Sequence, residues 1–363
     1  MKRGRFSIIF NRPAPWLPPP RAHTVPVAVS TRVRLARNLA DTPFPGQAPL
    51  AARQAVLERV ADVVGALDLL GPGWLAADMG ELGDLERRLL GERRLISRDL
   101  GRLGTGAGVI IRKDEQLSLM VNEEDHVRFQ VILPGFRLKE AWRVADAADT
   151  ACQSRLPFAF RPDLGFLTAC PSNLGTGLRA SVLLHLPALV LTERLEPAGR
   201  AARELGLTVR GLYGEGTDAV GGFFQLSNQS TLGDSEATLL DRLDGVVRKL
   251  VDAEETARQE LAANRRELLL DRVGRAYGIL RHAWLLSTQD AIQNLSFVLL
   301  GCALGLFSAL ESRNLHELMV LIQPGHLQKA AKKNLDEAAR DALRARLVRQ
   351  YLQQAGNGGA PAA

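Results

Sequence analysis

The 363-residue sequence lacks the short motifs by which many enzymes hold nucleotides, metals or acyl groups. No glycine is followed by lysine, so the sequence contains no P-loop. HExxH, GxSxG and paired CxxC patterns are also absent, which excludes the common signatures of metalloproteases, serine hydrolases and zinc ribbons. The run LGTGAG at 103–108 lacks the spacing of a dinucleotide fingerprint. Any nucleotide is therefore held by another device.

Cysteine is scarce, and the apolar runs are short or interrupted. Cys152, Cys170 and Cys302 are an odd number without CxxC spacing, which argues against a disulfide framework or a zinc site and indicates a reducing compartment. The apolar run Phe6–Phe10 is too short for the core of a signal peptide. The uncharged run Ala291–Leu310 contains Gln, Asn and Ser, which favours a buried helix over a membrane span. The sequence thus predicts a cytoplasmic protein with no membrane partner and no metal ligand set of its own.

Lysine and aromatic residues are also few. Only seven of the 46 basic residues are lysines, so the net charge of +6 comes from arginine, and an excess this small does not indicate direct nucleic-acid binding. Aromatic residues make up 5% of the chain, so the core consists mainly of Leu, Val and Ala. The hydrophobic fraction of 46% is ordinary for a globular protein, and the length favours two domains.

The first two thirds of the chain mix strand and helix patterns. Residues 1–24 are predicted to form an irregular, Pro-rich basic arm, and residues 25–262 a catalytic domain. GVIIR at 108–112 and LSLMV at 117–121 predict an antiparallel hairpin that leads into a strand at 127–133. Further strands are predicted at 165–169, 208–212 and 223–226, and helices at 50–70 and 138–151. This pattern predicts an α+β domain with a largely antiparallel sheet flanked by helices.

From Gly233 onward the pattern is almost wholly helical. Asp234, Ser235 and Glu236 predict a helix start, and an apolar stripe at helical spacing follows. Further helices are predicted at 267–283, 288–311, 314–322 and 334–353, with a break at Pro324-Gly325. We therefore predict an all-helical C-terminal domain over residues 263–356 and a flexible tail over residues 357–363.

Four segments combine charged residues with strand patterns or turn glycines. They are STRVRLAR at 30–37, VNEEDHVR at 121–128, CPSNLGTGLRAS at 170–181 and VRGLYGEGTD at 209–218. Arginine is permanently charged and its planar guanidinium matches phosphate oxygens in pairs, so a cradle of arginines can replace a glycine-rich loop. The candidate ligands of an anionic triphosphate are the five arginines of these segments, Arg32, Arg34, Arg128, Arg179 and Arg210.

These segments resemble those of the phosphagen (guanidino) kinases, and most closely the bacterial protein arginine kinases of the McsB type, over residues 25–260. The resemblance implies ATP and Mg²⁺, with the five arginines on the nucleotide phosphates. It also implies that Glu124 anchors the acceptor guanidinium and removes its proton, and that Cys170 stabilises its charge. His185 is predicted to approach the adenine, with a purely structural role as the alternative. The implied fold is a guanidino-kinase-like domain.

A second acid is expected in the fourth segment, where the sequence departs from the small-molecule kinases. Those enzymes have a second arginine where Tyr213 stands. The spacing from Arg210 assigns Glu215 as the second acid, whereas a gapless alignment favours Asp218. Both assignments stay open.

Two further departures bear on the substrate. Small-molecule guanidino kinases have a helical domain before the first segment, but only 29 residues precede Ser30, which predicts an open site suited to protein substrates with an exposed arginine. In the C-terminal domain, Arg340, Asp341 and Arg344 form an RDxxRA pattern that resembles a phosphoarginine-binding motif. The alternatives are a kinase of free arginine and a phosphoarginine-binding adaptor with little catalysis.

The resemblance also implies cellular partners. It predicts a role in stress response, in which phosphorylated proteins are marked for a Clp-type ATPase and protease. A small zinc-containing activator protein and homodimerisation are further expectations.

Overall fold

The computed structural model describes residues 3–18, 25–67, 69–212, 220–307 and 310–355. Its main feature is an eight-stranded sheet with the strand order β2-β3-β4-β5-β1-β8-β10-β9. The pairs β2–β3, β3–β4, β4–β5 and β5–β1 are antiparallel, which confirms the predicted type of sheet. The strands are β1 (Ala28–Arg37), β2 (Leu75–Asp78), β3 (Gly108–Ile111), β4 (Leu117–Val121), β5 (Val127–Pro134), β8 (Leu178–His185), β9 (Leu207–Gly211) and β10 (Phe223–Asn228). A separate hairpin pairs β6 (Phe160–Arg161) with β7 (Gly165–Phe166).

The chain divides into two compact units, and each is described by itself. The first comprises Met1–Trp16, Ser30–Ser181 and Ser227–Asp244, and the second comprises Leu17–Val29, Val182–Leu226 and Gly245–Ala363. The predicted boundary at 262/263 lies close to the break between α8 (Glu236–Asn264) and α9 (Arg266–His282). Residues 182–226 nevertheless group with the helical C-terminal part rather than with the rest of the predicted catalytic domain.

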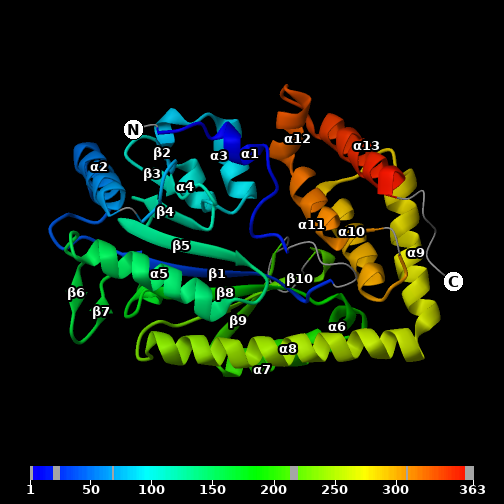
Figure 1. Cartoon of the computed structure of the whole chain (residues 1–363). Coiled ribbons are helices and arrows are strands. Elements are labelled where there is room, and N and C mark those ends of the chain that lie inside the picture. The colour runs from blue at the N-terminus through cyan, green and yellow to red at the C-terminus, as the bar shows by residue number, and fades with distance from the viewer. Residues whose placement is uncertain (1–2, 19–24, 68, 213–219, 308–309, 356–363) are drawn as a thin grey trace. The chain divides into compact units, whose positions relative to one another are not determined.

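In the first unit, alternation along β1 separates a core face from a charged face. Val33 and Leu35 are fully buried, whereas Arg32 and Arg34, which alternate with them along the strand, are partly exposed, as the period of two in a strand requires. Helix α5 (Leu138–Gln153) runs along β5 in Figure 1 and buries a stripe that includes Ala141, Ala145 and Ala148. The other helices of four or more residues that lie wholly in this unit are α1 (Ser7–Phe10), α2 (Leu50–Ala66), α3 (Asp84–Glu92) and α4 (Arg98–Arg102).

The N-terminal segment differs from the predicted arm. Phe6, Ile9 and Phe10 belong to a buried cluster with residues of α3, β3 and β4. Trp16 is 4% exposed, and its indole Nε1 donates a hydrogen bond to the carbonyl of Arg93 at 3.0 Å. Residues 3–16 therefore pack within the first unit, because their apolar side chains outweigh the irregular, Pro-rich character of the segment.

The second unit is mainly helical. Helix α10 (Thr288–Ala303) buries Ile292, Leu295 and Leu299 completely and packs against α9 and α11 (Ser312–Leu321). Pro324 begins α12 (Pro324–Ala331), since proline fits the first turn of a helix; the break predicted at this proline is therefore a helix start. The other helices of four or more residues that lie wholly in this unit are α6 (Pro187–Leu191), α7 (Leu195–Glu204) and α13 (Glu337–Ala355). No helix among the described residues combines the length and hydropathy needed to cross a bilayer.

Candidate active site

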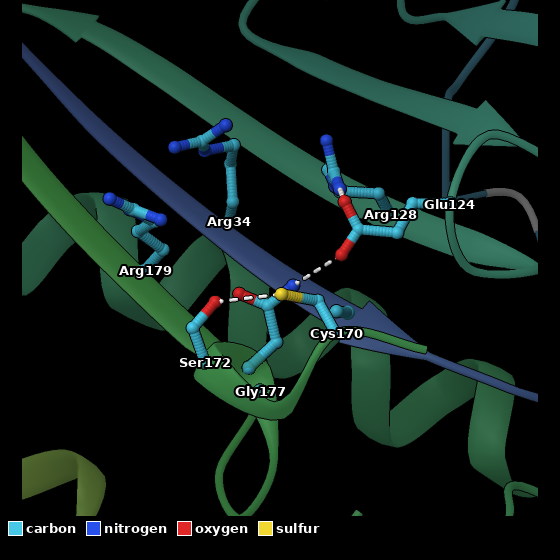
Figure 2. Close-up of a pocket in the computed structure, with 9 residues that line it drawn as sticks. Arg34, Glu124, Arg128, Cys170, Ser172, Gly177 and Arg179 are labelled. Atoms are coloured by element: carbon cyan, nitrogen blue, oxygen red, sulfur yellow. Dashed lines mark hydrogen bonds and ion pairs between the residues drawn. The ribbon is translucent and has the colours of Figure 1, made fainter. Parts of the chain in front are cut away.

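A pocket of about 220 Å³ lies in the first unit, at the ends of β1, β5 and β8 (Figure 2). It brings together side chains from three of the four segments singled out in the sequence. In Figure 2, Arg34 and Arg179 lie on one side of the pocket, and Glu124 and Arg128 lie on another. The lining residues are Arg34, Ala36, Glu124, Arg128, Cys170, Ser172, Asn173, Gly177 and Arg179.

The arginine side of the pocket carries a concentration of positive charge. Burial, with repulsion from neighbouring arginines, holds the pKa of Arg34 well below its ordinary value. Burial, followed by repulsion from Arg94 and other arginines, lowers the pKa of Arg32 to about 9. Among the described residues, Arg34 Nε has no hydrogen-bond partner. Crowded cations, one of which has a buried donor without a partner, are costly unless an anion binds there, so the geometry favours a polyanionic ligand.

The acidic side of the pocket centres on Glu124, whose side chain is 39% exposed. Its Oε2 lies 3.3 Å from Arg128 Nη2, and its Oε1 accepts a hydrogen bond from Asn173 Nδ2 at 3.1 Å. The other end of the Arg128 guanidinium, Nη1, lies 2.7 Å from Oε2 of Glu123. Glu124 thus faces the pocket with a carboxylate that is accessible to a cationic acceptor.

The loop at 170–177 forms the floor of the pocket and is tied to its surroundings by backbone carbonyls. Cys170 Sγ lies 3.0 Å from Ser172 Oγ. Thr231 Oγ1 donates to the carbonyl of Leu174 at 2.6 Å, and Arg37 Nη1 donates to the carbonyl of Thr176 at 2.9 Å. These bonds fix the loop, and the thiol of Cys170 at its start lines the pocket.

Gly177 and the buried pair Arg37–Asp149 explain why this loop follows β1 so closely. Gly177 has φ +65°, and a Cβ there would lie 2.6 Å from the carbonyl oxygen of Ala36. Arg37 Nη2 lies 2.7 Å from Asp149 Oδ2, and its guanidinium stacks on Phe166 at 3.5 Å from the ring centroid. Only glycine combines this backbone conformation with so close an approach.

The segment Glu-Glu-Asp-His at 123–126 divides into two pairs of residues with different surroundings. Asp125 and His126 are buried: Asp125 Oδ1 accepts hydrogen bonds from Asn38 Nδ2 and from the amide of Ala169. His126 Nδ1 accepts from the amide of Leu39 at 3.0 Å. Asp125 and His126 thus bind the segment just after β1, and Asp125 also binds the loop that precedes Cys170. Glu123 and Glu124 instead contact Arg128.

The remaining predicted nucleotide ligands are not among the residues that line the pocket. Arg32 interacts electrostatically with Arg128 and Arg179. Arg210 is an exposed residue of β9 in the second unit. His185 is fully buried in that unit; its Nε2 lies 2.7 Å from Ser296 Oγ, and its ring stacks on Phe223. The nucleotide contacts of Arg210 and His185 stay predictions.

The second acid falls outside the described residues. Glu215 and Asp218 both lie in the stretch 213–219, so neither assignment is tested.

The RDxxRA motif lies on α13 in the second unit. Arg344 is 1% exposed and donates to the carbonyls of Ile322 at 3.0 Å and Leu286 at 2.6 Å, and it also pairs with Asp341. Arg340 Nη1 donates to the carbonyl of Leu335 at 2.7 Å. In this arrangement the guanidinium of Arg344 binds backbone carbonyls of the unit, and phosphoarginine binding by the motif stays a prediction.

Sequence reasoning missed three residues that the geometry connects with the site. Asn173 binds Glu124, Glu123 binds Arg128, and Arg94 contributes to the positive charge around Arg32. Arg94 has φ +62°, and its guanidinium stacks on Trp16 at 4.3 Å from the ring centroid. Asn173 and Glu123 stand inside the segments singled out in the sequence, so a signal existed for them. Arg94 lies in the turn after α3, which carries no motif.

The arrangement suits the transfer of a phosphoryl group. Arginines on one side can neutralise phosphate oxygens, and a carboxylate with a neighbouring thiol on the other can hold a cationic acceptor in line.

Comparisons with known proteins show the family of the chain. Residues 58–257 match the model of the ATP:guanido phosphotransferase C-terminal catalytic domain, and residues 266–361 match that of the protein-arginine kinase McsB C-terminal domain. A protein-arginine kinase from Moorella thermoacetica is 48% identical over 90% of this chain and 94% of its own length. One from Brevibacillus brevis is 44% identical over 90% and 92%.

Solved structures give the same fold. The substrate-free duplicated taurocyamine kinase from Schistosoma mansoni has a TM-score of 0.56 and 28% identity, over 65% of this chain and 34% of that one. This chain thus spans about a third of that duplicated enzyme. Lombricine kinase, at 24% identity and a TM-score of 0.55, covers 71% of this chain and 77% of its own and supports the fold alone. The chain therefore belongs to the ATP:guanido phosphotransferase family, and its C-terminal part matches the domain that accompanies the catalytic domain in protein-arginine kinases.

Proposed function

We propose that this chain transfers the γ-phosphoryl group of ATP to arginine side chains of proteins and forms phosphoarginine. The observation that carries the proposal is the pocket in which Arg34 and Arg179 lie on one side and Arg128 and Glu124 on another, with Cys170 in the lining. The relatives named protein-arginine kinase, which match about nine tenths of the chain, support a protein as the acceptor. The exposure of Glu124 supports the same choice, because a side chain projecting from a protein surface needs an open site.

The chemistry follows from the two sides of the pocket. A nitrogen of the acceptor guanidinium attacks the γ-phosphorus, the bond from that phosphorus to the bridging oxygen breaks, and ADP leaves. A guanidinium is a poor nucleophile because its charge is delocalised and its pKa exceeds about 12. Glu124 accepts its proton and aligns it, and Cys170 stabilises its charge. The arginines neutralise the charge that develops on the phosphoryl oxygens.

Mg²⁺ is part of the proposal as a companion of ATP. In proteins this ion commonly binds substrate phosphates with only one or two carboxylates. The described residues contain no group of three or more His, Cys, Asp or Glu placed to hold a metal. They therefore do not form a metal cage, and we propose that the ion arrives on the phosphate oxygens of ATP, whose charge it neutralises.

The choice of acceptor is tested by incubating the enzyme with ATP and either an unfolded protein or free arginine. Products are analysed by mass spectrometry without acid, which preserves the P–N bond. We expect phosphoarginine within the protein. Label found only in free arginine would show that the chain is a small-molecule guanidino kinase.

We also propose a cytoplasmic role in stress response, with homodimerisation, a small zinc-containing activator protein and delivery of phosphorylated proteins to a Clp-type ATPase. The match of residues 266–361 to the protein-arginine kinase C-terminal domain supports this proposed cellular role. Degradation of an unfolded substrate by a Clp-type protease should depend on both this kinase and ATP. Equal degradation without the kinase would contradict this role.

A further inference from the structure

Glu123 is a buried carboxylate beside the pocket that the proposed chemistry does not use. Its side chain is 4% exposed, against 39% for Glu124 next to it in the chain. Its Oε1 accepts a hydrogen bond from Ser97 Oγ at 2.7 Å, and its Oε2 lies 2.7 Å from Arg128 Nη1. Ser97 is itself fixed, because its Oγ caps α4 by accepting from the amide of Leu100 at 2.9 Å. Oε1 of Glu123 is therefore held by a hydrogen bond, whereas Oε2 has no hydrogen-bond partner among the described residues and is held by its ion pair with Arg128 alone.

Arg128 connects this buried acid with the exposed one. Its backbone is fixed in the sheet between Ala36 of β1 and Met120 of β4. Nη1 lies 2.7 Å from Glu123 and Nη2 lies 3.3 Å from Glu124. An ion pair shielded from water is weakened less by solvent and salt than an exposed one. The contact with Glu124 is therefore the one that an incoming anion displaces.

We propose that Glu123 is a positioning residue: the chain of contacts from Ser97 through Glu123 fixes one end of the Arg128 guanidinium, and the other end exchanges between Glu124 and a phosphate oxygen. The inference rests on the proposed function, which supplies the phosphate. When the phosphate takes Nη2, Glu124 keeps its contact with Asn173 and becomes available to the acceptor. Arg128 thereby transmits the arrival of the nucleotide to the acid that acts on the acceptor.

Neutralising Glu123 is expected to affect ATP binding and kcat differently, because it changes both the charge of the pocket and the orientation of Arg128. Removing a negative charge beside an anion site makes the pocket more positive, so ATP binds at least as tightly. The Arg128 guanidinium, however, loses the partner that sets its direction. An interaction that matters for alignment in the transition state appears in kcat rather than in ground-state binding.

The test compares Glu123→Gln with wild type. We expect kcat for protein-arginine phosphorylation to fall at least about tenfold, while the Kd for ATP, titrated without acceptor, stays within about threefold or decreases. Ser97→Ala should cause a smaller fall in kcat, and Ser97→Thr, which keeps the hydroxyl, should restore it.

Two variants control for general damage. Glu115→Gln neutralises another buried carboxylate, which lies 2.7 Å from Arg93 and outside the pocket lining. Ser287→Ala removes an equivalent helix cap, the Oγ of Ser287, to which the amide of Asp290 donates a hydrogen bond. We expect both to lower the thermal midpoint and to leave kcat of the folded protein unchanged.

An unchanged kcat in Glu123→Gln, or a rise in the Kd for ATP parallel to the fall in kcat, would overturn the inference. If Glu123→Gln does not fold, the two Ser97 variants test the inference instead. Equal kcat in Ser97→Ala and Ser97→Thr would overturn the inference. Wild-type enzyme that phosphorylates no protein arginine would instead refute the proposed function, so the two failures are distinguishable.

Discussion

At the scale of single residues, Arg34 shows how a ligand site is built at the expense of stability. Its guanidinium lies among other arginines, and burial keeps its pKa well below the ordinary value. We predict that Arg34→Met raises the free energy of unfolding of the ligand-free protein by about 1–2 kcal/mol, because it removes this repulsion. Wild type at an ATP concentration of 100 Kd should gain about 2.7 kcal/mol, and the variant at the same ATP concentration should gain much less.

Denaturant unfolding with and without ATP measures both effects. Arg143→Met, which changes an exposed arginine of α5, serves as the control. A lower stability of ligand-free Arg34→Met would contradict this view of the pocket.

The residue scale also shows what the sequence could predict. Arg34, Arg128, Arg179, Glu124 and Cys170 stand in short motifs, and the pocket contains all five. The separate role of Glu123 could not be read in the same way. It depends on the turn after β4, where Asn122 adopts φ +54° and the neighbouring acids take different surroundings.

At the scale of elements, the loop at 170–177 depends on a glycine. A Cβ at Gly177 would meet a backbone oxygen at 2.6 Å, whereas Gly135 has a similar φ of +68° with nothing within 4 Å. We predict that Gly177→Ala destabilises the protein by about 1–3 kcal/mol more than Gly135→Ala and lowers the rate of phosphoryl transfer. Urea unfolding and a transfer assay measure the two effects. Equal effects of the two substitutions would show that the close approach is unimportant.

Elements with strong local signals were predictable. The hairpin of β3 and β4 and the helix α5 lie where alternation and helical periodicity placed them. β8 lies outside the predicted strands, because the run VLLHL at 182–186, apolar except for His185, fits a buried strand and a helix equally well. Helix α12 was missed because Pro324 was interpreted as a break.

At the scale of the whole molecule, buried histidines make stability depend on pH. Burial lowers the pKa of His316 on α11 to about 4, while its value in the unfolded chain is about 6.5. The unfolded state therefore binds a proton that the folded state refuses, and stability is lost as pH falls from about 6.5 to about 4. For this one proton the loss approaches about 1.4 kcal/mol per pH unit.

The measurement is the unfolding free energy of wild type and His316→Gln across this pH range. The variant should lose less stability on acidification than wild type. Parallel curves would show that His316 does not titrate differently in the two states.

The division of the whole chain was only partly predictable. The change to helical periodicity located the break near α8 and α9, but residues 182–226 join the second unit through contacts distant in sequence. The N-terminal segment was interpreted from its prolines and charges, whereas Phe6, Ile9 and Trp16 determine where it packs. Such contacts depend on tertiary structure and leave no local periodicity.

The two-sided pocket is tested most directly by measuring ATP affinity and phosphoryl transfer to protein arginines in Glu124→Gln and Arg179→Ala. We predict that Glu124→Gln keeps the Kd for ATP within about threefold and lowers the transfer rate by about 10²–10⁴. Arg179→Ala should raise the Kd for ATP about 10- to 100-fold, because a charge-assisted hydrogen bond is lost. Equal losses of ATP affinity in the two variants would contradict the assignment of arginines to the nucleotide and Glu124 to the acceptor.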